Sequence, residues 1–175
     1  QLVGVIGSRS LPESFAPRVA SVVSFFLSLG FSIASGGAIG ADSFALSAML
    51  DQGVCPERAI ASRGVIFSAW QSASGFPASV RPQVARFLTS GGQVVWGSAS
   101  PGSPRQVAVS ALLGRNQRLV SACSILVAFL HGYSRGSLYT VRQAVSRGVP
   151  VIVFLCGDAS LPGDLASHCF VMHFP

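Results

Sequence analysis

Residues Phe31 to Leu46, FSIASGGAIGADSFAL, decide the fold, because a short apolar run changes there into a glycine-rich turn and then into an amphipathic segment. The alternation over residues 31–35 predicts a strand. The glycines that follow permit positive φ and close approach of a ligand, and Asp42 is typical of the first turn of a helix. The stretch therefore predicts a strand, a phosphate-sized loop and a helix whose first N–H groups face an anion.

The glycine spacing by itself is a weak ligand signal. It matches neither the dinucleotide-binding fingerprint nor the P-loop with its Lys. A tight turn with Asp42 as a favourable charge at the helix start explains the same residues without any ligand. Both interpretations stay open until the other turns of the chain are considered.

Length and composition indicate one well-cored domain over residues 1–175. Half of the residues are hydrophobic and only 10% are charged, against roughly 25% charged in ordinary globular domains. Some apolar surface is therefore expected to be covered by a partner. We expect a homo-oligomer.

The net charge of +6 comes from twelve Arg, and the chain contains no Lys. Guanidinium groups are planar forks that suit phosphate, so this balance favours a nucleic acid or a nucleotide as partner. A coding bias explains the missing Lys without any functional reason.

A charge-free stretch, residues 19–41, is long enough to span a bilayer. It contains five serines and a helix-ending Gly30, so we expect helix, turn and strand of a buried α/β unit and no membrane segment. A cytoplasmic protein is the simplest interpretation. The four cysteines have no C-x-x-C spacing and are expected to be buried free thiols, and we expect no metal and no cofactor.

Apolar runs and helical periods alternate along the rest of the chain. Strands are predicted at residues 2–6, 93–96, 124–130, 150–155 and 170–173, with one more at 58–62 or 65–70. Helices are predicted at residues 15–29, 41–50, 80–88, 105–122 and 138–147, the fourth broken or kinked around 114–118. This alternation predicts an α/β fold, a three-layer α/β/α sandwich with a mostly parallel sheet.

Three turns that follow predicted strands share small residues and hydroxyls. They are Gly7-Ser8-Arg9, residues 36–42 and residues 134–137. Ligands bind beyond the carboxyl ends of the strands in such sheets, and Arg115 and Arg118 are able to join from a helix. The convergence of these turns is a stronger signal than any one of them.

Four motifs together resemble the DNA-processing protein A (DprA/Smf) family. They are I-G-S-R at 6–9, S-G-G-A-I-G-A-D at 35–42, G-R-N-Q-R-L-V-S-A-C-S at 114–124 and S-R-G-S-L-Y-T-V-R-Q-A at 134–144. They occur in the family's order and span nearly the whole chain. The family is a branch of the SLOG superfamily of Rossmann-like nucleotide-binding proteins.

The resemblance implies a Rossmann-like fold, a homodimer and a positively charged pocket for single-stranded DNA phosphates. It also implies a role in DNA recombination or uptake, with a recombination protein as partner. We expect no catalysis. The residues expected to line the pocket are Gly7, Ser8, Arg9, Ser35, Gly36, Gly37, Gly40, Asp42, Arg115, Asn116, Arg118, Arg135, Gly136, Ser137 and Thr140.

The chain departs from the family at Ile39, where an Arg is common, and Arg135 is in a position to compensate. A nucleotide-sensing SLOG domain is the first alternative function. The second is the phosphoribohydrolase of the same superfamily, which needs a loop glutamate to cleave nucleoside monophosphates. Residues 136–143 contain no carboxylate, so the hydrolase is the less favoured alternative.

Overall fold

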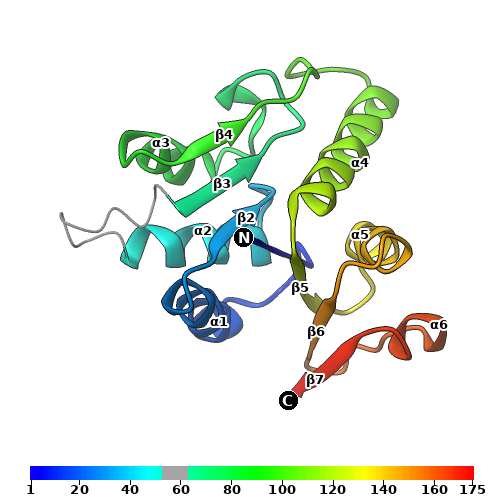
Figure 1. Ribbon diagram of the computed structural model, residues 1–175. Coiled ribbons are helices and arrows are strands. Elements are labelled where there is room, and N and C mark those ends of the chain that lie inside the picture. The colour runs from blue at the N-terminus through cyan, green and yellow to red at the C-terminus, as the bar shows by residue number, and fades with distance from the viewer. Residues whose placement is uncertain (53–62) are drawn as a thin grey trace.

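The computed structural model describes residues 1–52 and 63–175, which form a seven-stranded sheet covered by helices (Figure 1). The strands are β1 (Leu2–Gly7), β2 (Ser32–Ser35), β3 (Gly64–Phe67), β4 (Gln93–Val95), β5 (Ile125–His131), β6 (Val151–Cys156) and β7 (Phe170–Phe174). Their order is β4-β3-β2-β1-β5-β6-β7, and every pairing is parallel. The mostly parallel sheet predicted from the sequence is confirmed.

In the described part of the chain, six α-helices connect the strands. They are α1 (Ala16–Ser28), α2 (Ala41–Gln52), α3 (Arg81–Thr89), α4 (Arg105–Ala122), α5 (Arg135–Ser146) and α6 (Gly163–Ala166). Strand residues alternate between two cores: Val127 and Phe129 of β5 face the core shared with α1, α2 and α3, while Leu126 and Ala128 face the one shared with α4 and α5. The three-layer sandwich follows from this two-sided burial.

Helix α4 runs without interruption through Gly114, where the sequence predicted a break. A glycine in a helix interior costs only about 1 kcal/mol relative to Ala, and side-chain contacts of the turn that follows Gly114 hold the helix. Its Arg118 donates hydrogen bonds to backbone carbonyls near the sheet, and its Gln117 donates one to Tyr139 of α5.

The structure also corrects the predicted start of one helix and selects between two predicted positions of one strand. Helix α5 begins at Arg135, three residues before the predicted start, because small polar residues are accepted in a first turn. Strand β3 overlaps the second of its two candidate runs, residues 65–70, and ends three residues before that run does. The first candidate, residues 58–62, lies outside the described residues.

Buried free thiols occur at Cys123 and Cys156, as predicted, whereas Cys169, directly before β7, is only half-buried and Cys55 lies outside the described residues. Burial raises the pKa of Cys123 to about 12, so this thiol stays protonated at neutral pH. Within residues 1–52 and 63–175, no cluster of three His, Cys, Asp or Glu side chains is placed to hold a metal ion. No described helix is both long enough and apolar enough to cross a membrane.

The strand order creates a switch point between β1 and β5. The chain builds outward from β1 to β4, and α4 then carries it back to β5, which pairs with the other side of β1 (Figure 1). Open parallel sheets bind ligands beyond the carboxyl ends of the strands at such a point. The turns after β1, β2 and β5 all lie there.

Candidate nucleic-acid interface

The turns after β1 and β2 are packed directly against each other. The backbone carbonyl of Ser8 accepts hydrogen bonds from the N–H groups of Leu11 (3.2 Å) and Ala41 (3.3 Å). Gly40 has φ +77°, and a Cβ there would press on the Ser8 carbonyl and lie 2.7 Å from that of Arg9. Only glycine allows this approach, so the sequence GADS starts α2 against the β1 turn.

Ser8 also joins the turn after β1 to the turn after β5. Its N–H donates to the carbonyl of Phe129 at 2.9 Å, and its hydroxyl accepts the N–H of His131 at 2.9 Å. Ser8 is fully buried. This serine therefore fixes the relative position of two turns that are about 120 residues apart in sequence.

Beneath the glycine loop lies a buried ion pair between Asp42 and Arg115. The Arg115 Nη1 lies 3.7 Å from the Asp42 Oδ2 and also donates to the Gly36 carbonyl, while the same Oδ2 accepts the Ala38 N–H at 3.2 Å. Asp42 is 4% exposed and Arg115 6%. The pair holds the loop in shape from α2 on one side and α4 on the other.

Burial and charge act in opposite directions on this pair. Burial raises the pKa of Asp42, and the neighbouring Arg115 and Arg9 oppose that rise. Burial lowers the pKa of Arg115, which Asp42 opposes and the charges of Arg9 and Arg118 reinforce. An arginine stays protonated in proteins. Arg115 and Arg9 therefore both act on the one carboxylate of Asp42, and Arg118 acts on Arg115, so cations outnumber anions in this cluster.

The start of α5 supplies a second set of small residues at this edge. Ser134 precedes the helix, and its hydroxyl donates to the hydroxyl of Ser137 at 2.8 Å, while Thr140 Oγ1 donates to the Gly136 carbonyl at 2.9 Å. The side chains of Ser137 and Thr140 are thus buried and engaged within α5. Arg135, by contrast, is exposed in the first turn.

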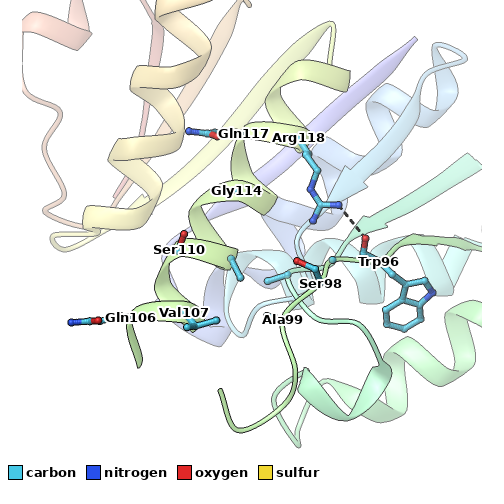
Figure 2. A pocket seen from close by; sticks show the side chains of 12 residues that line it. Trp96, Ser98, Ala99, Gln106, Val107, Ser110, Gly114, Gln117 and Arg118 are labelled. Atoms are coloured by element: carbon cyan, nitrogen blue, oxygen red, sulfur yellow. Dashed lines mark hydrogen bonds between the residues drawn. The ribbon is translucent and has the colours of Figure 1, made fainter. Parts of the chain in front are cut away.

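Arg118 takes a different position from the one expected. It donates to the carbonyls of Ser68 (2.6 Å) and Trp96 (3.1 Å), which follow β3 and β4, and Figure 2 shows it reaching from α4 to Trp96. It lines a groove of about 960 Å³ between α4 and these strand ends. The sequence analysis missed this groove, although small residues at helical spacing on α4, Ser110, Ala111 and Gly114, were a readable signal.

The expected site residues therefore fall into groups with different surroundings. Buried at the converging turns are Ser8, Ser35, Gly36, Gly40, Asp42 and Arg115, and Gly7 packs there too, because a Cβ on it would lie 2.7 Å from Ala41 Cβ. Gly37 faces Phe76, since a Cβ there would lie 3.0 Å from the Phe76 Cδ1. Asn116 is half-buried on α4, and Arg9, Arg135 and Gly136 are exposed.

Two solved structures share this fold. DNA processing protein A from Helicobacter pylori superposes with a TM-score of 0.71 at 16% identity, over 93% of this chain and 69% of that one. DprA from Streptococcus pneumoniae superposes with a TM-score of 0.63 at 20% identity, over 96% of this chain and 53% of that one. This chain thus spans about half the length of the streptococcal protein.

No curated protein matches the sequence significantly. The family model for DNA recombination-mediator protein A matches residues 1–170. That match covers nearly the whole chain and includes all four motifs at the carboxyl edge of the sheet and on α4. The chain therefore belongs to the DNA recombination-mediator protein A family.

Proposed function

We propose that this chain binds single-stranded DNA through its phosphates at the β1/β5 switch point and acts in DNA recombination. The single observation that carries the proposal is the pair of exposed arginines there. Arg9 follows β1 and Arg135 begins α5, and the hydrogen bond from the His131 N–H to Ser8 joins their turns. The Helicobacter pylori relative has been studied for its single-stranded DNA binding mode.

In this proposal one set of residues holds the turns in place and another contacts the phosphates. Ser8, Gly40, Asp42 and Arg115 form a buried frame that holds the turns. Arg9 and Arg135 project cations from that frame, and the N–H groups in the first turn of α5 add a favourable dipole for phosphate. A fixed frame reduces the ordering that binding would otherwise cost.

The geometry argues against hydrolysis by Asp42. Its carboxylate is buried, paired with Arg115 and bonded to the Ala38 N–H, so it is not free to activate water at a scissile bond. Nucleotide sensing uses the same phosphate chemistry as DNA binding. The choice between these two functions is therefore a question of ligand length.

A homodimer, a recombination protein as partner and a cytoplasmic location belong to this proposal. Exposed apolar side chains on the edge strand β7, Phe170 and Met172, support self-association. Recombination takes place at the chromosome, so a protein that binds single-stranded DNA for recombination is expected in the cytoplasm. Partner recognition is then expected to use a surface other than the two exposed arginines.

The test is a binding comparison at one fixed salt concentration. Fluorescence anisotropy of a labelled single-stranded oligonucleotide measures its affinity, and unlabelled duplex of the same length and a mononucleotide serve as competitors. We expect the single strand to compete best, because its flexible backbone can follow two cationic turns. A mononucleotide that competes as well as the oligonucleotide would assign the site to nucleotide sensing instead.

A further inference from the structure

A second cavity lies beside the switch point, between the turn after β5 and the turn after β6. Its volume is about 250 Å³, below the roughly 300–1,000 Å³ of ordinary small-molecule sites. Leu130 and Leu138 form its apolar floor, and Asp158 and Ser160 supply polar groups. None of the residues at the converging turns of β1 and β2 lines it.

Tyr133 stands at the mouth of this cavity with 84% of its surface exposed. It is the most exposed of the large hydrophobic side chains in the described chain. An aromatic ring that is so exposed on a short turn contributes little buried area to the stability of the fold. Such rings serve as platforms on which nucleic acid bases stack.

The cavity differs in charge from the neighbouring phosphate-binding turns. Its lining residues include the carboxylate of Asp158 and no arginine. A phosphate would be repelled there, whereas an uncharged base with hydrogen-bonding edges would not. The small volume also fits one base better than a whole nucleotide.

The distance to the proposed phosphate site is short. Tyr133 is two residues after His131, whose N–H is bonded to Ser8, and two residues of extended chain span roughly 7 Å. Ser10 Oγ also lies 3.5 Å from the His131 carbonyl, so the turn is held at two points. A nucleotide with its phosphate at the switch point therefore has its base within reach of the ring.

We propose that Tyr133 and the cavity between the β5 and β6 turns form a base subsite of the bound single strand. The base stacks on Tyr133 and presents its hydrogen-bonding edge to Asp158. A carboxylate accepts hydrogen bonds from the amino groups of cytosine or adenine, which thymine lacks. The subsite rests on the proposed function and adds a preference for cytosine or adenine over thymine to it.

The experiment measures anisotropy with three strands of equal length: oligo-dC, oligo-dT and a strand of abasic sites, which keeps the phosphates and removes the bases. The protein variants are Tyr133→Phe, Tyr133→Ala and Asp158→Ala. Phe25→Ala is the matched control, because Phe25 is an exposed ring in the last turn of α1, where the chain enters the amino end of β2. Thermal unfolding of each variant confirms that it is folded.

We expect Tyr133→Ala to weaken oligo-dC binding by about 5- to 150-fold, the range of one lost stacking contact, and to leave the abasic strand unaffected. Tyr133→Phe keeps the ring and should stay within about twofold of wild type. Asp158→Ala should abolish the preference for oligo-dC over oligo-dT. Phe25→Ala should change nothing.

Three results would overturn the subsite. They are no loss in Tyr133→Ala, an equal loss for the base-bearing and abasic strands, and a cytosine preference that survives Asp158→Ala. The proposed function fails in a different way, since wild-type protein would then bind none of the three strands, the abasic one included.

Discussion

At the scale of single residues, the arginines near the site are of two kinds: those bonded within the protein, and those exposed and able to contact a ligand. Arg115 pairs with Asp42 and donates to the Gly36 carbonyl. Arg118 donates to the carbonyls of Ser68 and Trp96. Removing Arg115 would leave Asp42 buried without its partner, at a cost of roughly 3–5 kcal/mol. A loss of DNA binding in that variant would therefore not report on a phosphate contact.

Arg9 is the residue that tests phosphate binding directly. It is exposed, so Arg9→Ala should weaken single-strand binding without unfolding the protein, and should flatten the log–log salt dependence by roughly 0.7 per lost phosphate contact. Affinity is measured by anisotropy at four salt concentrations. Arg86→Ala is the control, because Arg86 is exposed on α3, away from the switch point. Equal losses in both variants would mean that binding is diffuse electrostatics.

Gly40 tests the close approach of the β1 and β2 turns. Gly40→Ala should lower the free energy of unfolding by about 2–5 kcal/mol, because positive φ costs about 1–2 kcal/mol and the clash with the Ser8 and Arg9 carbonyls adds about 1–3. Gly102→Ala is matched in φ, at +79°, but no heavy atom of the described chain lies within 4 Å. Gly102→Ala should therefore lose only the free energy that positive φ costs. If urea denaturation gives equal losses of unfolding free energy for the two variants, Gly40 is not needed for the close approach of the two turns.

At the scale of elements, α4 combines three contacts that a broken helix could not make together. It places Arg115 under the glycine loop, Arg118 on the ends of β3 and β4, and Gln117 against Tyr139 of α5. One turn separates Arg115 from Arg118, so both lie on the face toward the sheet. Tertiary contacts of the residues that directly follow Gly114 thus favour the regular helix.

Gly114→Ala should therefore stabilise the protein. The added methyl group meets no heavy atom of the described residues within 4 Å, and alanine is favoured over glycine in a helix by about 1 kcal/mol. The melting temperature is expected to rise, with DNA binding unchanged. Gly4→Ala is the contrasting variant, since a Cβ there would lie 2.8 Å from Leu119 in the core. A lower melting temperature in Gly114→Ala would indicate that the helix needs the glycine.

At the scale of the whole molecule, the sheet has an open edge at β7 that carries apolar side chains. Phe170 is 69% exposed and Met172 50%, and both occur at alternate positions of the strand. An exposed, apolar edge strand is a site of association between chains. The low charged fraction of the sequence pointed to the same need for a covering partner.

We predict that the protein is a dimer and that Met172→Lys shifts it toward monomer, because a charge on the edge strand opposes burial. Sedimentation velocity well above micromolar concentration measures the state. Leu29→Lys is the control, since Leu29 is similarly exposed at the end of α1. A wild-type protein that sediments as a clean monomer would contradict the prediction.

Much of the fold was predictable from the sequence because its signals are local. Apolar runs such as 124–130 must be buried on both faces, and the alternation of such runs with helical periods leaves a parallel sheet as the simplest arrangement. Gly36, Gly37 and Gly40 indicated a tight turn, and the motifs indicated which turns belong to one site. These inferences need only neighbouring residues.

The tertiary structure alone decided which side chains are free to meet a ligand. Arg9 and Arg115 are equally basic in sequence, but Arg115 is buried against Asp42, and Asp42 lies 73 positions away along the chain. Tyr133 likewise lies between the predicted strand 124–130 and the predicted helix 138–147, and only packing of the β5 and β6 turns put a cavity beside it. Burial depends on contacts between distant segments, and no local pattern encodes them.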